Sequence, residues 1–205
     1  MKLNLNAPFF QFINTAFDFV ILNICFILTC LPVFTIGAAL TALYTVTMAE
    51  AEDKGLPFTK TYFHTFTRCF IRSSLLFAGC ICIGALLLFC LFFWLSFESP
   101  LALIPSVLSL AALIALVICL IYLFPLLARY ECSSRQLLFN ALFIGTSHLP
   151  ATGLFAVIFA AAGFLFKIWY PARTFMLLMG CSFLAYCFSF LFLKIFKSQE
   201  IVGHN

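Results

Sequence analysis

The chain has 205 residues, of which 65% are hydrophobic and 9% are charged, and its net charge is +4. An average soluble domain has about 25% charged and about 45–50% apolar residues. Here 11 Lys and Arg with 7 Asp and Glu would have to cover the whole water-facing surface of a globular domain, which is too few. The composition excludes a soluble monomer, a disordered chain and a nucleic-acid-binding domain. It predicts an integral membrane protein that has the lipid bilayer as its main partner.

Long uncharged runs predict that the membrane segments are helices. Leu75–Phe97 and Leu101–Ala128 contain no charged residue, and each exceeds the ~20 residues that a helix needs to cross a bilayer. A membrane β-barrel would instead show segments of about ten residues with alternating polarity. We therefore predict an all-α fold, a polytopic transmembrane helix bundle that forms a single integral membrane domain over residues 1–205.

The number of spans depends on the first third of the chain. Later spans are expected near residues 75–97, 101–128, 151–167 and 174–194. The apolar stretches 9–31 and 33–50 meet at Leu31-Pro32, where proline removes a backbone donor and disfavours helix at the preceding residue. One interpretation is a single kinked span, which gives five helices and an external N-terminus. The preferred one is a tight hairpin at Leu31-Pro32, which gives six helices with both termini in the cytoplasm.

Loop charges predict the orientation. Eight Lys or Arg residues lie in residues 50–72, residues 129–150 and the C-terminal tail, whereas two, Lys167 and Arg173, lie on the opposite side. Short cytoplasmic loops carry the excess of positive charge in multi-pass proteins. The three basic segments, and with them the C-terminus, are therefore predicted to be cytoplasmic.

Two amphipathic stretches flank the predicted spans. Residues 58–74 carry an aromatic stripe at helical spacing between basic residues, and residues 132–148 repeat the pattern with aliphatic residues. A basic amphipathic helix next to a span typically lies in the interface plane. We expect two cytoplasmic interfacial helices here.

Three prolines raise the question of an internal repeat. Pro32, Pro100 and Pro171 each mark the outer turn of a predicted hairpin, at spacings of 68 and 71 residues. One interpretation is three units, each an interfacial helix followed by a hairpin. The alternative is that hairpin turns favour proline and that the spacing has no further meaning.

The sequence lacks the motifs of catalysis, metal binding and cofactor binding. Most of the ten cysteines lie in apolar spans, none forms a Cys-x-x-Cys pair, and the three histidines are far apart. No Gly-x-Ser-x-Gly elbow and no phosphate-cradling Gly-rich loop is found. We expect no catalytic residue, no metal and no cofactor, and hence a protein that is not an enzyme.

One ionisable residue stands within a predicted span. Asp18 lies near the middle of residues 9–31, with Asn23 five residues further on. Ionisable groups are costly in lipid, so Asp18 and Asn23 are a candidate intramembrane polar site for a proton or a cation. The alternative is that Asp18 sits at a helix end or is a packing residue.

Three blocks carry a resemblance to a known family. The break from Leu31 to Gly37, followed by Ala42-Leu43-Tyr44, resembles the signature of the YesL-like family of bacterial integral membrane proteins, as do the blocks 62–70 and 124–130. Ala38 departs from the family pattern, which often has proline there. The signature positions in these blocks are Pro32, Thr35, Gly37, Tyr44, Phe63, Phe66, Phe70, Pro125 and Arg129.

The resemblance implies a setting for the protein and no mechanism. The YesL-like family has no assigned activity, and its members are often encoded beside carbohydrate uptake and degradation systems. We therefore expect a protein of the bacterial cytoplasmic membrane that is an accessory to carbohydrate uptake or sensing, with another membrane protein, such as a transporter subunit, as its partner. The alternative is a small secondary transporter or permease that uses Asp18 and the Pro32–Gly37 helix break.

Overall fold

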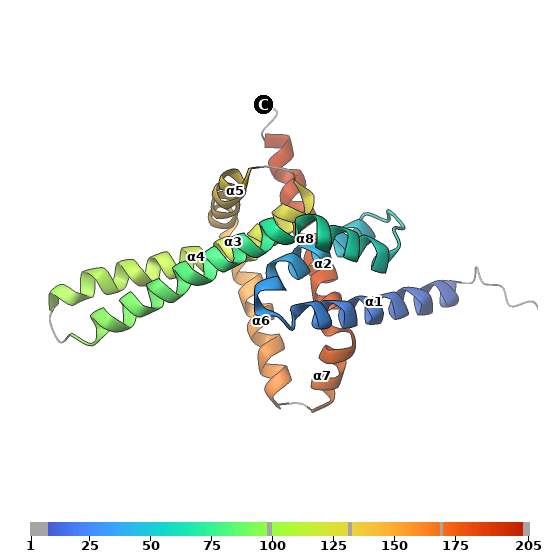
Figure 1. Cartoon of the computed structure of the whole chain (residues 1–205), viewed down its shortest axis with the longest axis horizontal. Coiled ribbons are helices and arrows are strands. Elements are labelled where there is room, and N and C mark those ends of the chain that lie inside the picture. Colours follow the sequence, from blue (N-terminus) through green and yellow to red (C-terminus); the bar gives the residue numbers. More distant parts are fainter. Residues whose placement is uncertain (1–7, 98–99, 131–132, 169, 203–205) are drawn as a thin grey trace, which may run out of the picture.

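The computed structural model describes residues 8–97, 100–130, 133–168 and 170–202, and over these residues every regular element is helical (Figure 1). The all-α prediction is therefore confirmed. The elements in chain order are α1 (Pro8–Cys30), η1 (Val33–Thr35), α2 (Ile36–Ala51), α3 (Phe58–Leu95), η2 (Pro100–Ala102), α4 (Leu103–Arg129), α5 (Ser134–Ser147), α6 (Leu149–Ile168), α7 (Tyr170–Phe175), the π-helix η3 (Met176–Gly180) and α8 (Cys181–Val202).

Five segments of the described chain are long and apolar enough to cross a membrane. They are Val33–Ala51, Phe58–Leu95, Leu103–Arg129, Leu149–Ile168 and Arg173–Lys197, whereas the apolar part of α1, Asn14–Cys30, is shorter.

The chain reverses between α1 and α2. α1 packs against α2, and its Phe19 ring lies edge-on to Phe58, the first residue of α3, with ring centroids 5.4 Å apart. The break at Leu31-Pro32 is thus a hairpin, as in the six-helix interpretation. The number of described segments long and apolar enough to cross a membrane is nevertheless five, because the apolar part of α1 is short.

α3 differs from the predicted pair of elements. Its 38 residues join the stretch expected to be interfacial, 58–74, to the span expected at 75–97. Neither glycine nor proline lies near the expected boundary, so nothing in the sequence breaks the helix there. At 1.5 Å per residue α3 is about 57 Å long, roughly twice the thickness of a hydrocarbon core. The expected second interfacial helix does form a separate element, α5, whose start is closed by a capping box between Ser133 and Gln136.

α2 is the buried centre of the molecule. It packs against α3, α8, α4 and α1, and most of its residues are small or carry a hydroxyl group. Small residues allow helices in lipid to approach closely. At Gly37 an added Cβ would lie 2.5 Å from the Ser73 carbonyl oxygen and 2.8 Å from Phe77 Cβ, so no other residue fits without moving α3.

Hydroxyl pairs join the helices inside this core. The Thr41 and Ser73 hydroxyls are hydrogen-bonded at 3.2 Å between α2 and α3, and the Thr47 and Ser189 hydroxyls at 2.8 Å between α2 and α8. Such bonds satisfy polar groups that have no access to water and hold helices together in lipid.

An aromatic cluster fills the space between α2, α4, α6 and α8. Phe192 of α8 is 1% exposed and stacks on Phe155 of α6, with centroids 4.6 Å apart. Tyr44 of α2 and Tyr122 of α4 each pack edge-on against the Phe192 ring, with ring centroids 5.6 Å apart. Part of the high phenylalanine content therefore belongs to the core.

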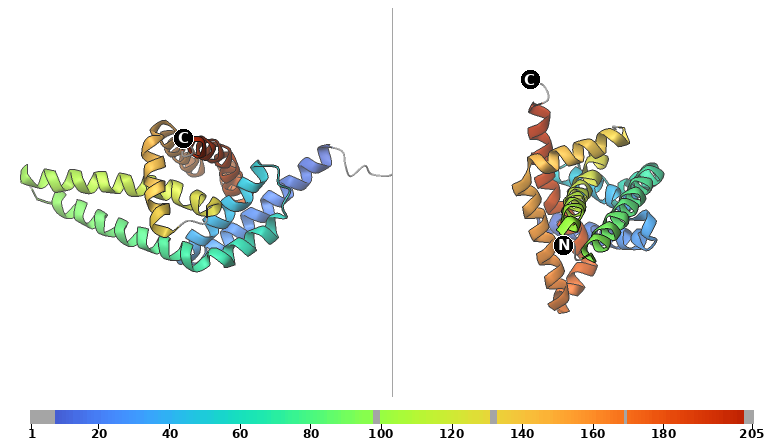
Figure 2. Two further views of the ribbon diagram at one scale, coloured as in Figure 1. Left: turned by 90° about the horizontal axis from the view of Figure 1, so that it is seen from above. Right: turned by 90° about the vertical axis from the view of Figure 1, so that its left-hand side faces the viewer.

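Two hairpins extend away from this core in different directions. The α3–α4 hairpin and the hairpin formed by α6 with α7 and α8 diverge in Figure 1, and the views in Figure 2 agree. Pro100 begins the turn of the first hairpin, and Pro171 lies in α7 at the tip of the second. Their outer halves expose large apolar side chains such as Leu86, Phe89, Leu108 and Phe164.

Candidate functional site

Three adjoining cavities lie where α2, α4 and α8 end near the start of α3. Their volumes are about 660, 490 and 430 Å³, and the third shares residues with each of the others. We call their charged lining residues the polar face: Glu52, Lys54, Arg68, Arg72, Arg129, Lys194 and Lys197. Residues from all three basic segments, 50–72, 129–150 and the C-terminal tail, thus come together at the polar face. That this face is cytoplasmic stays a prediction.

Glu52 joins two cations of the polar face. Its Oε1 atom accepts a hydrogen bond from Arg129 Nη1 at 2.8 Å, and its Oε2 atom lies 2.6 Å from Lys54 Nζ. Lys54, and then Arg129, hold the pKa of the Glu52 carboxyl at about 2, against a usual value of 4.5. The pair therefore stays charged at neutral pH and ties the end of α2 to the end of α4, 77 residues away in sequence.

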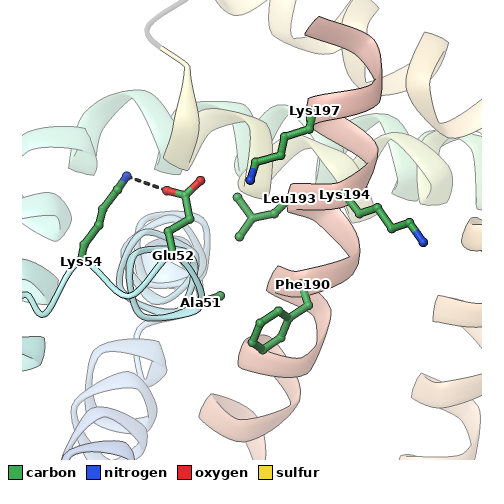
Figure 3. A pocket seen from close by; sticks show the side chains of 7 residues that line it. All are labelled: Ala51, Glu52, Lys54, Phe190, Leu193, Lys194 and Lys197. Carbon is green, nitrogen blue, oxygen red and sulfur yellow. Dashed lines mark ion pairs between the residues drawn. The ribbon is translucent and has the colours of Figure 1, made fainter. Parts of the chain in front are cut away.

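The turn after α2 places these charges. Asp53 and Gly55 adopt positive φ angles of 52° and 58°, which reverse the chain at once after the helix. The Lys54 N–H donates to the Ala49 carbonyl at 3.0 Å and so closes the end of α2. Glu52 and Lys54 are thereby held side by side, as Figure 3 shows.

The first cavity opens between this turn and α8. Figure 3 shows Lys197 extending from α8 toward Glu52, whereas Lys194 points away from it. Phe190 and Leu193 form the apolar floor. The charged side chains that line this cavity therefore come both from the α2–α3 turn and from α8.

The second cavity, which we call the arginine cavity, contains three guanidinium groups. Arg68 and Arg72 of α3 line it together with Arg129 of α4, and Thr65 adds a hydroxyl group. Arg72 Nε donates to the Ser134 hydroxyl of α5 at 3.3 Å. Among the described residues the three guanidinium groups meet one carboxylate, Glu52, which pairs with Arg129, so basic groups are in excess and the arginine cavity is suited to an anion.

The structure does not bring Asp18 and Asn23 together. Asp18 is exposed and lies beside Glu50 near the polar face, whereas Asn23 is fully buried between α1 and α8. Twelve residues of helix, about 18 Å, also separate Asp18 from the end of α1 at Cys30, two residues before Pro32. The acid therefore lies near the middle of α1, and the helix break follows its C-terminal end.

Asn23 has a clear packing role. Its Nδ2 atom donates to the Leu177 carbonyl at 2.7 Å, and its Oδ1 atom accepts from the Ser182 N–H at 3.1 Å. Leu177 lies within the wide turn of η3 and Ser182 follows it by two residues, where the regular α-helical hydrogen bonds are shifted. The buried amide thus satisfies backbone groups that the π-helix would leave unpaired.

The signature residues of the helix break organise the first hairpin. The Thr35 hydroxyl donates to the carbonyls of Thr29 and Pro32, and the Thr29 hydroxyl is hydrogen-bonded to Tyr62 of α3. Gly37 then lets α2 touch α3. The break is therefore fixed in one geometry.

The remaining signature residues are spread over different parts of the fold. Phe34 packs edge-on against Phe70 at 6.5 Å, so the first two blocks touch, and Phe66 packs on Phe70. Phe63 is 44% exposed. Tyr44 joins the aromatic cluster, Pro125 is buried inside the last turns of α4, and Arg129 lines the polar face.

Several residues that hold the site together carry no recognisable sequence pattern. Glu52 belongs to no motif, and its partner Arg129 is remote in sequence. Ser182 and Ser189 are isolated serines in an apolar span, which by themselves indicate nothing. The run of small and hydroxyl residues in α2 was the available signal for a buried helix.

A protein family described as "Protein of unknown function, DUF624" matches residues 19–91, from the second half of α1 to near the end of α3. No curated protein and no solved structure matches the chain. Across the described residues, no three His, Cys, Asp or Glu side chains are grouped so as to hold a metal ion.

Proposed function

We propose that this protein is a non-catalytic accessory of a carbohydrate uptake or sensing system in the bacterial cytoplasmic membrane. Its polar face would lie on the cytoplasmic side and would contact a membrane-protein partner such as a transporter subunit. The observation that supports this role most is the gathering of charge at the polar face, where six basic side chains surround one carboxylate among the described lining residues.

The apolar cavities support an accessory role over a transporter. Two further cavities lie along the membrane-length helices, one between α4 and α6 and one between α3, α4 and α5. Their described linings contain no Asp, Glu, Lys, Arg or His. A pathway for ions or sugars requires polar groups along its length. The carbohydrate setting itself rests on the YesL-like resemblance of the signature blocks.

A pull-down from membranes tests the partner. The tagged full chain is cross-linked in native membranes and its neighbours are identified by mass spectrometry. We expect recovery of a carbohydrate transporter subunit or sensor, and we expect Lys194→Glu with Lys197→Glu to reduce it at least fivefold. Both side chains are exposed on α8, so the folded core is spared.

The control reverses the charge of Lys167, which is exposed at the end of α6 away from the polar face. Lys167→Glu should leave recovery unchanged. Repeated recovery of the protein alone would overturn the accessory role. Sugar uptake by vesicles that contain only this protein would favour the transporter instead.

A further inference from the structure

We propose that the seam between α3 and α4 binds one anionic phospholipid. The lipid phosphate would occupy the arginine cavity, and one acyl chain would lie in an apolar groove that continues from it along α3. The proposal does not require the accessory role, although its three arginines belong to the polar face.

The groove is built by three helices. It has a volume of about 520 Å³, and apolar or small side chains of α3, α4 and α5 line it, among them Leu75, Gly79, Ile83, Ala112, Ala115 and Leu138. At Gly79 an added Cβ would meet no atom within 4 Å, so the groove has open space at this point. Its shape and composition suit a hydrocarbon chain.

The groove follows the arginine cavity along α3 and α5. On α3, Leu75 follows Arg72 by three residues, so the two share one face and lie about 4.5 Å apart along the helix axis. On α5, Leu138 follows Ser134 by four residues, and Ser134 accepts the hydrogen bond from Arg72. The two cavities share no lining residue but follow one another along α3 and α5, and we treat them as one binding surface.

One stripe of α3 carries both chemistries. Thr65, Arg68 and Arg72 line the arginine cavity, and the same face continues with Leu75, Gly79 and Ile83 in the groove. The change from basic to apolar residues takes a single helical turn. A phospholipid makes the same change where its phosphate meets its acyl chains.

Charge complementarity selects an anionic lipid. Guanidinium groups bind phosphate oxygens in pairs of hydrogen bonds, and each carries five donors, so it can serve a protein partner and a phosphate at once. The described cavity lining offers three guanidinium groups, of which Arg129 already pairs with Glu52. A zwitterionic headgroup would bring its own cation into this positive site and would bind less well.

Lipid binding to the purified full chain tests the proposal. Phosphatidylglycerol and phosphatidylcholine with identical acyl chains are titrated separately into the protein in detergent, and bound lipid is measured by native mass spectrometry. We expect at least tenfold tighter binding of phosphatidylglycerol. Arg68→Gln with Arg72→Gln should weaken it about 25-fold, about fivefold for each arginine.

A groove variant separates the lipid from a soluble anion. Gly79→Leu should fill the open space and weaken phosphatidylglycerol at least fivefold, while binding of inorganic phosphate stays unchanged. The controls are Gly163→Leu, where an added Cβ also meets nothing within 4 Å, and Lys60→Gln with Arg135→Gln, which removes two exposed charges outside the cavity. Neither control should change lipid binding by more than twofold.

Three results would overturn the proposal. Equal binding of both lipids would remove the charge selectivity. An equal loss in the control variants would indicate general attraction to a basic protein. Unchanged phosphatidylglycerol binding in Gly79→Leu would leave a site for soluble anions only, and this variant decides the matter even if the double arginine variant does not fold.

Discussion

α2 and the outer half of α3 are both apolar, yet they face different surroundings. In its most apolar stretch 67% of the α2 residues are buried, against 6% for α3, although α2 is the least hydropathic of the five spans. In water the more hydrophobic helix would be buried. In lipid the large apolar side chains can face outward, and small or hydroxyl-bearing residues mediate helix packing. Burial in this protein therefore follows side-chain size and hydrogen bonding.

The largest difference between the two regions should appear when the same side chain is truncated in each. Phe192→Ala removes a ring that contacts Phe155, Tyr44 and Tyr122 and should lower the free energy of unfolding by about 3–5 kcal/mol. Phe89→Ala removes a ring that is 69% exposed and should cost less than about 0.5 kcal/mol. Thermal unfolding of both variants in detergent measures the contrast, and equal losses would contradict the assigned core.

Replacing one glycine in α2 and one in the outer half of α3 should give the next largest difference in stability. Gly37→Leu forces a side chain against Ser73 and Phe77 and should destabilise the fold by about 1–3 kcal/mol, since α3 must shift. Gly79→Leu has room on the outer half of α3 and should be neutral or slightly stabilising. Retained stability in Gly37→Leu would show that the close approach of α2 and α3 is not required.

The buried amide of Asn23 should matter more than an exposed one on the same helix. Asn23→Leu leaves the Leu177 carbonyl and the Ser182 N–H without this partner and should cost about 1–3 kcal/mol. Asn14→Leu, at an exposed position, should change stability by less than about 0.5 kcal/mol. Thermal unfolding compares the two variants, and equal effects would contradict the role of Asn23 in supporting the π-helix.

Much of the helical layout could be predicted from the sequence, because long uncharged runs and clustered loop charges are local signals. The continuity of α3 across residues 74–75 could not, since an amphipathic segment followed by an apolar one fits either one helix or two. The role of Asn23 was also out of reach, because its partners lie 154 and 159 residues away. A polar residue in a span looks the same whether it binds a ligand or a backbone carbonyl.

The charged end of α2 gives a smaller and pH-dependent effect. The folded-state pKa of Glu52 is about 2, below its usual 4.5, so its stabilisation is present above about pH 4.5 and is lost as the pH falls through 2. Glu52→Gln should lose about 1–2 kcal/mol at pH 7 and should lack this acid-dependent loss. The free energy of unfolding measured between pH 2 and 7 checks this dependence. Asp18 is exposed, so the control Asp18→Asn should keep the loss of stability in acid.

Labelling by an apolar carbene reagent dissolved in the bilayer tests the central comparison most directly. The wild-type protein is reconstituted into vesicles, labelled by light and digested, and the label in each peptide is read by mass spectrometry. We expect residues 75–95 of α3 to carry several times more label per residue than residues 36–51 of α2. Equal labelling of the two stretches, or heavier labelling of α2, would contradict its place at the centre of the fold.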